Sequence, residues 1–363
     1  MLASFLIFLF FLKSLEKKVN VYFTKDITPS NMLRIFKKLN IQLKGNIGLK
    51  VHTGEEGGKY FLTPDFLKEI YDFTNGTFIE CNAAYNGSRN TTERHMDLLR
   101  KHGWLNNSRR TVIMDENCNN DFNLTIENSE VIKQNIVGEH LRDFNSCVVL
   151  SHFKGHPMGG FGGALKQLSI GFASQAGKTW IHTGGTITKW EDMDYFLAND
   201  LNFTAAMGDA ASSIVKYFRN KGDIAFINVL ANISLYCDCA GDLAPKPKIH
   251  DIGILASTDP VAVDQACLDM IKKHVDTGTD ELLEQIRNLS GENIINVAAK
   301  HKIGSREYNL IDIDKRDFSG LIIFISIIFG AILIAGVLAY CLGKKSKGNP
   351  KEKNISLVEQ KED

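Results

Sequence analysis

Six short runs of aliphatic and β-branched residues recur along this 363-residue chain, and they constrain its fold more than any other feature. The runs are almost continuously apolar, as strands buried on both faces are. They cover residues 47–52, 77–82, 111–115, 147–151, 223–230 and 252–256. Helical patterns separate them, and some begin with a capping residue before proline, at Thr28-Pro29, Thr63-Pro64 and Asp259-Pro260. The alternation predicts an α/β fold in which helices cover both faces of a largely parallel sheet.

The chain begins with an apolar run of eleven residues, Leu2 to Leu12. This run is too short to cross a hydrocarbon layer of about 30 Å, but it is typical of a secretory signal. We therefore predict a signal peptide over residues 1–16, with cleavage near Lys13 to Glu16. An uncleaved membrane anchor is the alternative.

A second apolar run, Gly320 to Gly343, contains 24 residues and no charge. At a rise of about 1.5 Å per residue, a helix of this length spans the hydrocarbon layer. We predict a transmembrane helix over residues 318–343. Three lysines follow between residues 344 and 347, so the positive-inside rule places residues 344–363 in the cytosol. Residues 17–317 would then form an extracellular or lumenal domain of a single-pass type I membrane protein.

The composition is that of a globular protein, with 44% hydrophobic and 23% charged residues. Forty-two basic residues balance 42 acidic residues, and the lysines and arginines are scattered along the chain. No basic stripe for nucleic acid is present, so we exclude nucleic acid as a partner. The expected partners are a membrane and a small ligand.

Sequons for N-glycosylation are frequent in residues 17–317. In a eukaryotic host we expect glycans on surface loops at some of these positions. The candidates are Asn75, Asn90, Asn106, Asn123, Asn202 and Asn288. Two further sequons, at Asn86 and Asn232, lie beside the polar segments described next, where a glycan would crowd a ligand site.

Polar side chains gather where the predicted strands end. They are His52 to Glu55, Asn82 and Tyr85, Asp115, Ser151 to Lys154, Asn232 with Cys237 to Cys239, and Ser257 with Asp259. In open parallel sheets, ligands bind beyond the carboxyl ends of the strands. We therefore predict a site at this edge of the sheet.

Residues 151–182 contain three histidines, three lysines and seven glycines. The segment GFASQAGKT resembles a phosphate-binding loop, but five residues instead of four precede its Gly-Lys pair, which argues against nucleotide binding. His152, Lys154 and His156 alternate, so an extended chain would place them on one face. Lysines disfavour a cation and favour a carboxylate or phosphate. The candidate ligand-binding residues are His152, Lys154, His156, Lys166, Lys178 and His182; solvated loop residues are the alternative interpretation.

The segment Cys237-Asp238-Cys239 is the other dense cluster of ligand-type residues, with His250 and Asp251 eleven residues further on. Its spacing differs from that of common zinc sites. A divalent metal site, a strained local disulfide and a redox-active thiol pair are all open interpretations, and an oxidising compartment favours the disulfide. Asp259 suits helix capping as well as chemistry, and Asp264 lies about one turn further on.

Five separated segments, in order, resemble one known family. They read LKVHTGEEGGKYFLTPDF, NAAYNGSRNTTERHMDLLRKHGW, SHFKGHPMGGFGGALKQLSIGFAS, CDCAG…HDIGILASTDPVAVDQACLDMI and AAKHKIGSREYNLIDID. The chain resembles the uncharacterised iron–sulfur centre proteins (domain of unknown function 362) from about Gly48 to Asp314. The resemblance gives added weight to the histidines and lysines of residues 152–178, to Cys237 to Cys239, and to Asp251, Asp259 and Asp264.

Members of that family carry a ferredoxin-type cysteine module after a Gly-Lys-x-x-x-His segment. The corresponding region here, TGGTITKWEDMDYFLAND, contains no cysteine, so we expect no iron–sulfur cluster. The resemblance assigns no reaction, and whether the protein is an enzyme stays open. We favour a domain that binds or transforms a small anionic molecule. A surface receptor or adhesion domain with a vestigial pocket is the alternative.

Overall fold

The computed structural model describes residues 18–116, 120–237, 241, 242, 244–315, 332 and 334–336. It divides the chain into two units, Met1–Asp314 and Lys315–Asp363. The predicted signal peptide, the cytosolic tail and most of the predicted transmembrane helix lie outside the described residues. Among the residues that are described, no helix is both long and apolar enough to cross a membrane.

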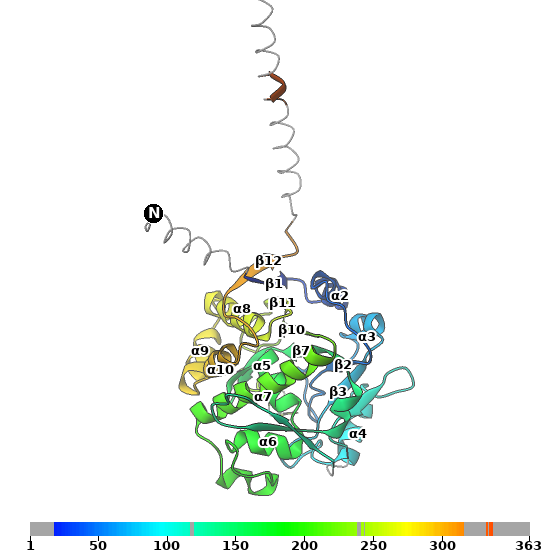
Figure 1. Ribbon diagram of the computed structural model, residues 1–363, viewed down its shortest axis with the longest axis vertical. Helices are drawn as coiled ribbons and strands as arrows, with labels where there is room; N and C mark the ends of the chain where they lie inside the picture. The colour runs from blue at the N-terminus through cyan, green and yellow to red at the C-terminus, as the bar shows by residue number, and fades with distance from the viewer. Residues whose placement is uncertain are drawn as a thin grey trace, which may run out of the picture. The chain divides into compact units, whose positions relative to one another are not determined.

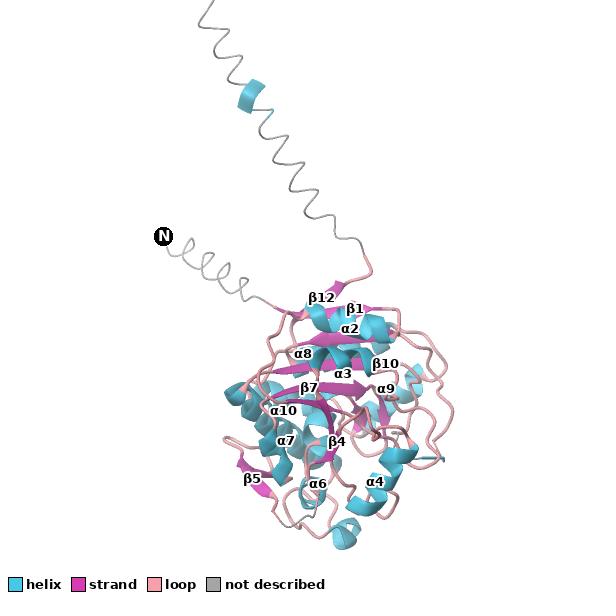
Figure 2. Ribbon diagram, turned by 90° about the vertical axis from the view of Figure 1, so that its right-hand side faces the viewer, coloured by secondary structure: helices cyan, strands magenta, loops and turns pink. Residues whose placement is uncertain are grey.

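The first unit is built on an eight-stranded sheet. In spatial order its strands are β12 (Tyr308–Asp312), β1 (Val19–Thr24), β11 (Gly253–Ser257), β10 (Ile224–Leu230), β7 (Ser146–His152), β2 (Ile47–Lys50), β3 (Thr77–Glu80) and β4 (Thr111–Ile113). Figure 2 shows the sheet with β12 at one edge and β4 at the other. From β10 to β4, each pair of adjacent strands is parallel. The predicted α/β fold with a largely parallel sheet is confirmed.

Strand β11 runs antiparallel to both of its neighbours, and its Ala256 lies opposite Ile227 of β10. Its carboxyl end therefore points to the opposite edge of the sheet, and the expectation that Ser257 and Asp259 join the other strand ends was wrong. A parallel neighbour needs a crossover back to the starting edge. Instead, Ile233 and Ile249 form an antiparallel bridge within the connection between β10 and β11.

Successive residues of each central strand face opposite sides of the sheet, so each strand contributes to two hydrophobic cores. In β7, Val148 and Leu150 enter one core, while Cys147 and Val149 enter the other. Helices α2 (Pro29–Lys38), α3 (Lys68–Thr74) and α4 (Thr92–Lys101) contribute to the first core. The second core lies under α5 (Ala164–Lys166), α6 (Gln175–His182), α7 (Asp200–Lys221), α8 (Pro260–Lys273), α9 (Thr279–Asn288) and α10 (Asn293–Lys300). Figure 1 shows α2 and α3 on one side of the strands and α8 and α10 on the other.

Shorter elements complete the unit. Strands β5 (Phe122–Thr125) and β6 (Gln134–Val137) form one small antiparallel sheet, and β8 (Lys154–His156) and β9 (Gly160–Gly162) form another. Helical turns lie at η1 (Glu139–Asp143), η2 (Gln167–Gly171) and η3 (Trp190–Tyr195). The second small sheet matters for function because it carries residues of the stretch 151–182.

Two of the three predicted helix starts are confirmed. The side chain of Thr28 accepts a hydrogen bond from the Asn31 amide and caps α2, and Asp259 caps α8 by accepting from the Ala262 amide. Thr63 also accepts a hydrogen bond three residues ahead, but α3 begins only at Lys68. Asp259 accepts a second hydrogen bond from the Ser305 amide, so its carboxylate is engaged in backbone capping.

Asp264 joins three elements in the interior. One carboxylate oxygen accepts hydrogen bonds from the Ala164 amide at 2.8 Å and from Asn228 Nδ2 at 2.7 Å, and the other accepts from the Leu165 amide at 2.9 Å. The side chain is fully buried, and burial raises its pKa to about 6. Asp264 therefore holds α5 against β10 and α8.

Replacing Asp264 with Asn should change the pH dependence of stability. A folded pKa of about 6 lies above the value of about 3.9 in an unfolded chain, so the native state holds this proton more tightly. The stability contributed by protonated Asp264 is fully present below about pH 4 and is lost as the pH rises through about 6. Urea denaturation measures the free energy of unfolding of both proteins. The value for the parent minus the value for Asp264→Asn should fall by about 2 to 3 kcal/mol between about pH 4 and pH 7.

The matched control is Asp192→Asn, because Asp192 is a half-exposed residue paired with Lys189 across 3.4 Å. This variant should follow the pH profile of the parent. Parallel profiles for the parent and Asp264→Asn would contradict the assignment.

Candidate functional site

A cavity of about 300 Å³ lies at the edge of the sheet where β2, β3 and β7 end. Its walls come from segments that are far apart in the sequence. Its charged and histidine side chains are His52, Glu80, Arg89, His156, Lys166, Lys178 and His182. Ala83, Ala84, Met158 and Ile170 supply apolar surface.

One wall rests on a buried ion pair at the ends of two neighbouring strands. Lys50 Nζ lies 2.7 Å from Glu80 Oε1 and also donates a hydrogen bond to the Val51 carbonyl at 2.6 Å. Burial lowers the pKa of Lys50 against the opposing charge of Glu80. Burial alone would raise the pKa of Glu80, but Lys50 and Arg89 together lower it to about 2. The Glu80 carboxylate is therefore ionised at neutral pH.

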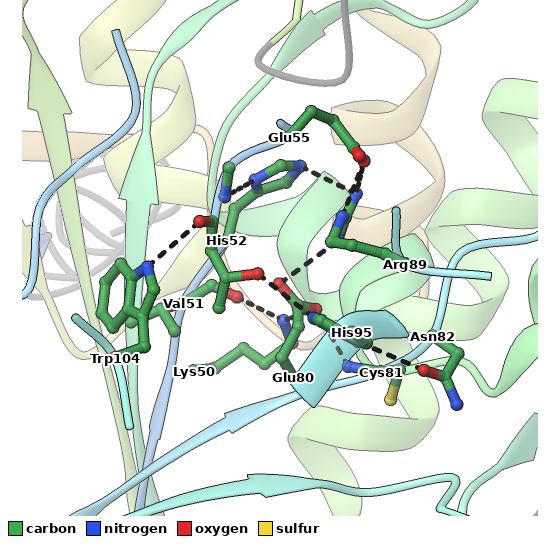
Figure 3. Close-up of polar contacts among 12 residues, drawn as sticks. Lys50, Val51, His52, Glu55, Glu80, Cys81, Asn82, Arg89, His95 and Trp104 are labelled. Carbon is green, nitrogen blue, oxygen red and sulfur yellow. Dashed lines mark hydrogen bonds and ion pairs between the residues drawn. The ribbon is translucent and has the colours of Figure 1, made fainter. Parts of the chain in front are cut away.

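Arg89 extends this pair into a four-charge network (Figure 3). Its Nε donates to Glu55 Oε1 at 2.6 Å, and its guanidinium lies 3.8 Å from Glu80 Oε2. Figure 3 shows the imidazole of His52 beside the same guanidinium, with 3.4 Å between the nearest nitrogens. Two cations and two carboxylates balance one another, so this network adds no net charge to the cavity.

Further hydrogen bonds connect the residues that surround this network. His95 contacts Asn82 Oδ1 at 3.1 Å through Nδ1 and Thr53 Oγ1 at 3.2 Å through Nε2. Burial lowers the pKa of His95 well below its usual value, so its ring is neutral. Asp115, after β4, accepts hydrogen bonds from the Asn82 and Gln175 amides and ties this wall to the start of α6.

The stretch 151–182 forms the facing wall. His156 Nδ1 accepts a hydrogen bond from the Gly159 amide at 2.9 Å, which holds the tight turn after β8. Lys166 comes from α5, while Lys178 and His182 lie one turn apart on α6, where His182 Nδ1 donates to the Lys178 carbonyl at 2.7 Å. Lys178 is only 7% exposed and donates to the Ala173 carbonyl at 2.6 Å. Among the described residues, no carboxylate lies within ion-pair distance of Lys166 or Lys178.

The other predicted ligand residues lie elsewhere. His152 and Lys154 are buried beside the cavity but do not line it: His152 Nε2 donates to the Ala231 carbonyl, and Lys154 Nζ donates to the His152 carbonyl. Asp251 is exposed and accepts a hydrogen bond from the Asn232 amide. Asp259 lies at the opposite edge of the sheet, and Asp264 is an internal brace.

The Cys-Asp-Cys segment is described only in part. Cys237 lines the cavity, which places the start of this segment at its mouth. Asp238 and Cys239 lie outside the described residues, so the three interpretations of the segment stay predictions.

Five of the six candidate glycosylation asparagines are exposed, and Asn90 is half-buried. Asn90 also lies at the back of the wall, because Gln175 Nε2 donates to its carbonyl at 2.8 Å. Glycosylation at all six positions stays a prediction.

Sequence reasoning missed Lys50, Glu55, Glu80 and Arg89 as a connected set. A signal existed for two of them, since a lysine and a glutamate inside apolar runs buried on both faces require a partner. Arg89 carried no such signal, because it follows a turn-rich segment that connects β3 to α4.

Comparison with known proteins supplies a family. A family model described as a domain of unknown function (DUF362) matches residues 47–269, more than half of the chain. The chain belongs to this family. The description of this family does not refer to iron or sulfur. The resemblance to iron–sulfur centre proteins, and the expected absence of a cluster from this chain, both stay predictions. No curated protein matches the DUF362 chain.

Two solved structures show a distant likeness. The lactate racemase apoprotein from Thermoanaerobacterium thermosaccharolyticum is 11% identical, with a TM-score of 0.41 over 70% of this chain. A protein from Thermotoga maritima is 17% identical, with a TM-score of 0.36 over 55% of this chain. The DUF362 chain spans only 57% and 50% of the length of these two proteins.

Replacing Lys50 with Met should destabilise the protein by about 3 kcal/mol, because it leaves Glu80 buried and without its principal partner. Lys68→Met is the matched control, since Lys68 pairs with Asp72 on an exposed helical face and should contribute about 0.5 kcal/mol or less. Denaturant unfolding measures both. The double variant Lys50→Met/Glu80→Leu should recover part of the loss. Equal, small effects of Lys50→Met and Lys68→Met would show that the buried pair is not a structural support.

Proposed function

We propose that residues 17–317 form an extracellular or lumenal domain that binds a small anionic molecule in the cavity between the Arg89 network and α6. The observation that carries the proposal is the pair of lysines, Lys166 and Lys178. Both line the cavity, and neither has a carboxylate partner among the described residues. The opposite wall is already neutral, so the cavity has a net positive lining.

The burial of Lys178 strengthens this inference. Its ammonium group donates a hydrogen bond to the neutral Ala173 carbonyl, and only 7% of the residue is exposed. Removing an ammonium group from water costs several kcal/mol unless an anion or a set of hydrogen bonds compensates. Its charge lowers the pKa values of Glu80, Asp115 and Asp121, but none of these carboxylates lies within ion-pair distance of Lys178. A bound carboxylate or phosphate would supply the missing compensation.

The volume of the cavity and its other lining groups limit the size and the chemical class of the ligand. A volume of about 300 Å³ is at the small end of the usual range for ligand sites. Glu80 Oε2 is buried and has no hydrogen-bond partner among the described residues. A hydroxyl group on the ligand would donate to this oxygen. The best match is a small carboxylate or phosphate ester that also carries a hydroxyl.

The anion proposal predicts which lysines matter. The full chain, purified in detergent, is titrated by calorimetry with inorganic phosphate, acetate and glycolate. Lys178→Met and Lys166→Met should each weaken binding about tenfold or more, equivalent to about 1.4 kcal/mol. Glycolate should bind more tightly than acetate, because only glycolate has a hydroxyl for Glu80. Lys133→Met, at an exposed lysine distant in sequence from the cavity, is the control and should match the parent.

Circular dichroism of each variant confirms that the protein is folded. Failure of all three anions to bind the folded parent, or equal binding by all three lysine variants, would overturn the proposal and favour a surface receptor with a vestigial pocket.

In this proposal residues 318–343 anchor the domain in a membrane, after removal of residues 1–16. The support is the 24-residue run without charge and the lysines that follow it. Expressed in eukaryotic cells, the full chain should remain in membranes after alkaline carbonate washing, whereas a chain ending at Asp317 should be secreted. Recovery of the full chain in the carbonate-soluble fraction would contradict the anchor.

A further inference from the structure

Two histidines and an aspartate converge on the surface, away from the lysines of the cavity. His250 lies in the segment before β11, His274 directly follows α8, and Asp276 belongs to the connection between α8 and α9. One ligand atom from each side chain lies within 4.8 Å of the other two. His250 Nδ1 is 2.7 Å from Asp276 Oδ1, and His274 Nε2 is 2.7 Å from Asp276 Oδ2.

We propose that His250, His274 and Asp276 form a binding site for a divalent transition metal, with zinc as the best match. Two imidazole nitrogens and one carboxylate oxygen are a common ligand set for zinc, with a fourth position left for water or another ligand. Tetrahedral zinc bonds of about 2.0 to 2.2 Å separate neighbouring ligand atoms by roughly 3.3 to 3.5 Å. Each histidine nitrogen therefore needs to move away from its Asp276 oxygen by less than an ångström, roughly the difference between that spacing and the 2.7 Å hydrogen bonds.

The surroundings suit a cation. The carbonyl end of α8 points toward His274, and the negative end of a helix dipole stabilises positive charge. The nearby lysines Lys248 and Lys272 are paired with Glu281 and Glu292, so their charges are compensated. Lys273 is exposed, where solvent screens its repulsion of a metal.

The site also has room for a fourth ligand. The His250 side chain is 86% exposed, so water reaches the point where the three side chains meet. A bound metal would connect the segment before β11 to the α8–α9 connection. That segment contains Ile249, which bridges to Ile233 and so leads to Cys237 at the cavity. Metal binding would therefore stabilise the loop that borders the cavity, whatever the ligand in the cavity is.

The test measures zinc binding by the full chain in detergent. Calorimetry with zinc alone is performed on a Cys237→Ser/Cys239→Ser background, which removes thiolates as competing ligands. His250→Gln and His274→Gln keep side chains of similar size that can still hydrogen-bond to Asp276. His140→Gln is the matched control, because His140 Nδ1 lies 2.9 Å from Asp143 Oδ2 in an exposed pair that has no second histidine.

We expect one zinc ion to bind per chain, with affinity reduced about tenfold or more in His250→Gln and His274→Gln and unchanged in His140→Gln. Zinc should also raise the melting temperature of the background protein but not that of His274→Gln. Cobalt substituted into the unmodified chain should show nitrogen and oxygen ligation without a sulfur charge-transfer band.

The proposal fails if the folded background protein binds no zinc at saturable stoichiometry. It also fails if both glutamine variants bind as tightly as the background protein, or if cobalt shows sulfur ligation only. Any of these results would leave His250, His274 and Asp276 as a hydrogen-bonded surface cluster.

Discussion

Burial of the central strands on both faces is the constraint from which the rest of the first unit follows. A strand covered by helices on each side can carry few polar side chains, because each buried charge requires a partner. Polar residues are therefore concentrated where strands end. Since β10, β7, β2, β3 and β4 run in the same direction, their carboxyl ends meet at one edge. The cavity lies at this edge, where polar groups from several strands converge.

The exceptions to that constraint build one wall of the cavity. Lys50 and Glu80 occupy the last positions of neighbouring parallel strands, so their side chains neutralise each other inside the protein. Arg89 and Glu55 complete a balanced set, which makes the wall rigid without making it charged. Lys166 and Lys178 on the facing wall have no carboxylate within ion-pair distance among the described residues, and the anion proposal rests on this difference between the two walls.

Local patterns predicted local structure well. The apolar runs predicted six of the eight strands of the main sheet, whereas β1 and β12 at its edge were not predicted. Thr28 and Asp259 predicted the beginnings of α2 and α8, because helix capping depends on neighbours within a few residues. The direction of β11 was predicted wrongly, because it depends on the path of the connection between β10 and β11, in which Ile233 pairs with Ile249. The roles of Asp264 and Asp259 were unpredictable for the same reason: their hydrogen-bond partners lie about 100 and 46 residues away.

The amino-acid sequence by itself determined the fold class, the family, and the collection of polar residues at the edge of the sheet where the cavity lies. Only the tertiary structure decided which of these residues face one another. It set Lys178 opposite Arg89, moved Asp259 to the other edge, and brought His250 to His274 and Asp276 instead of to Asp251. The physical reason is that periodicity and capping are local properties of the chain, whereas a site is made by long-range packing that chooses which strand ends and loops meet.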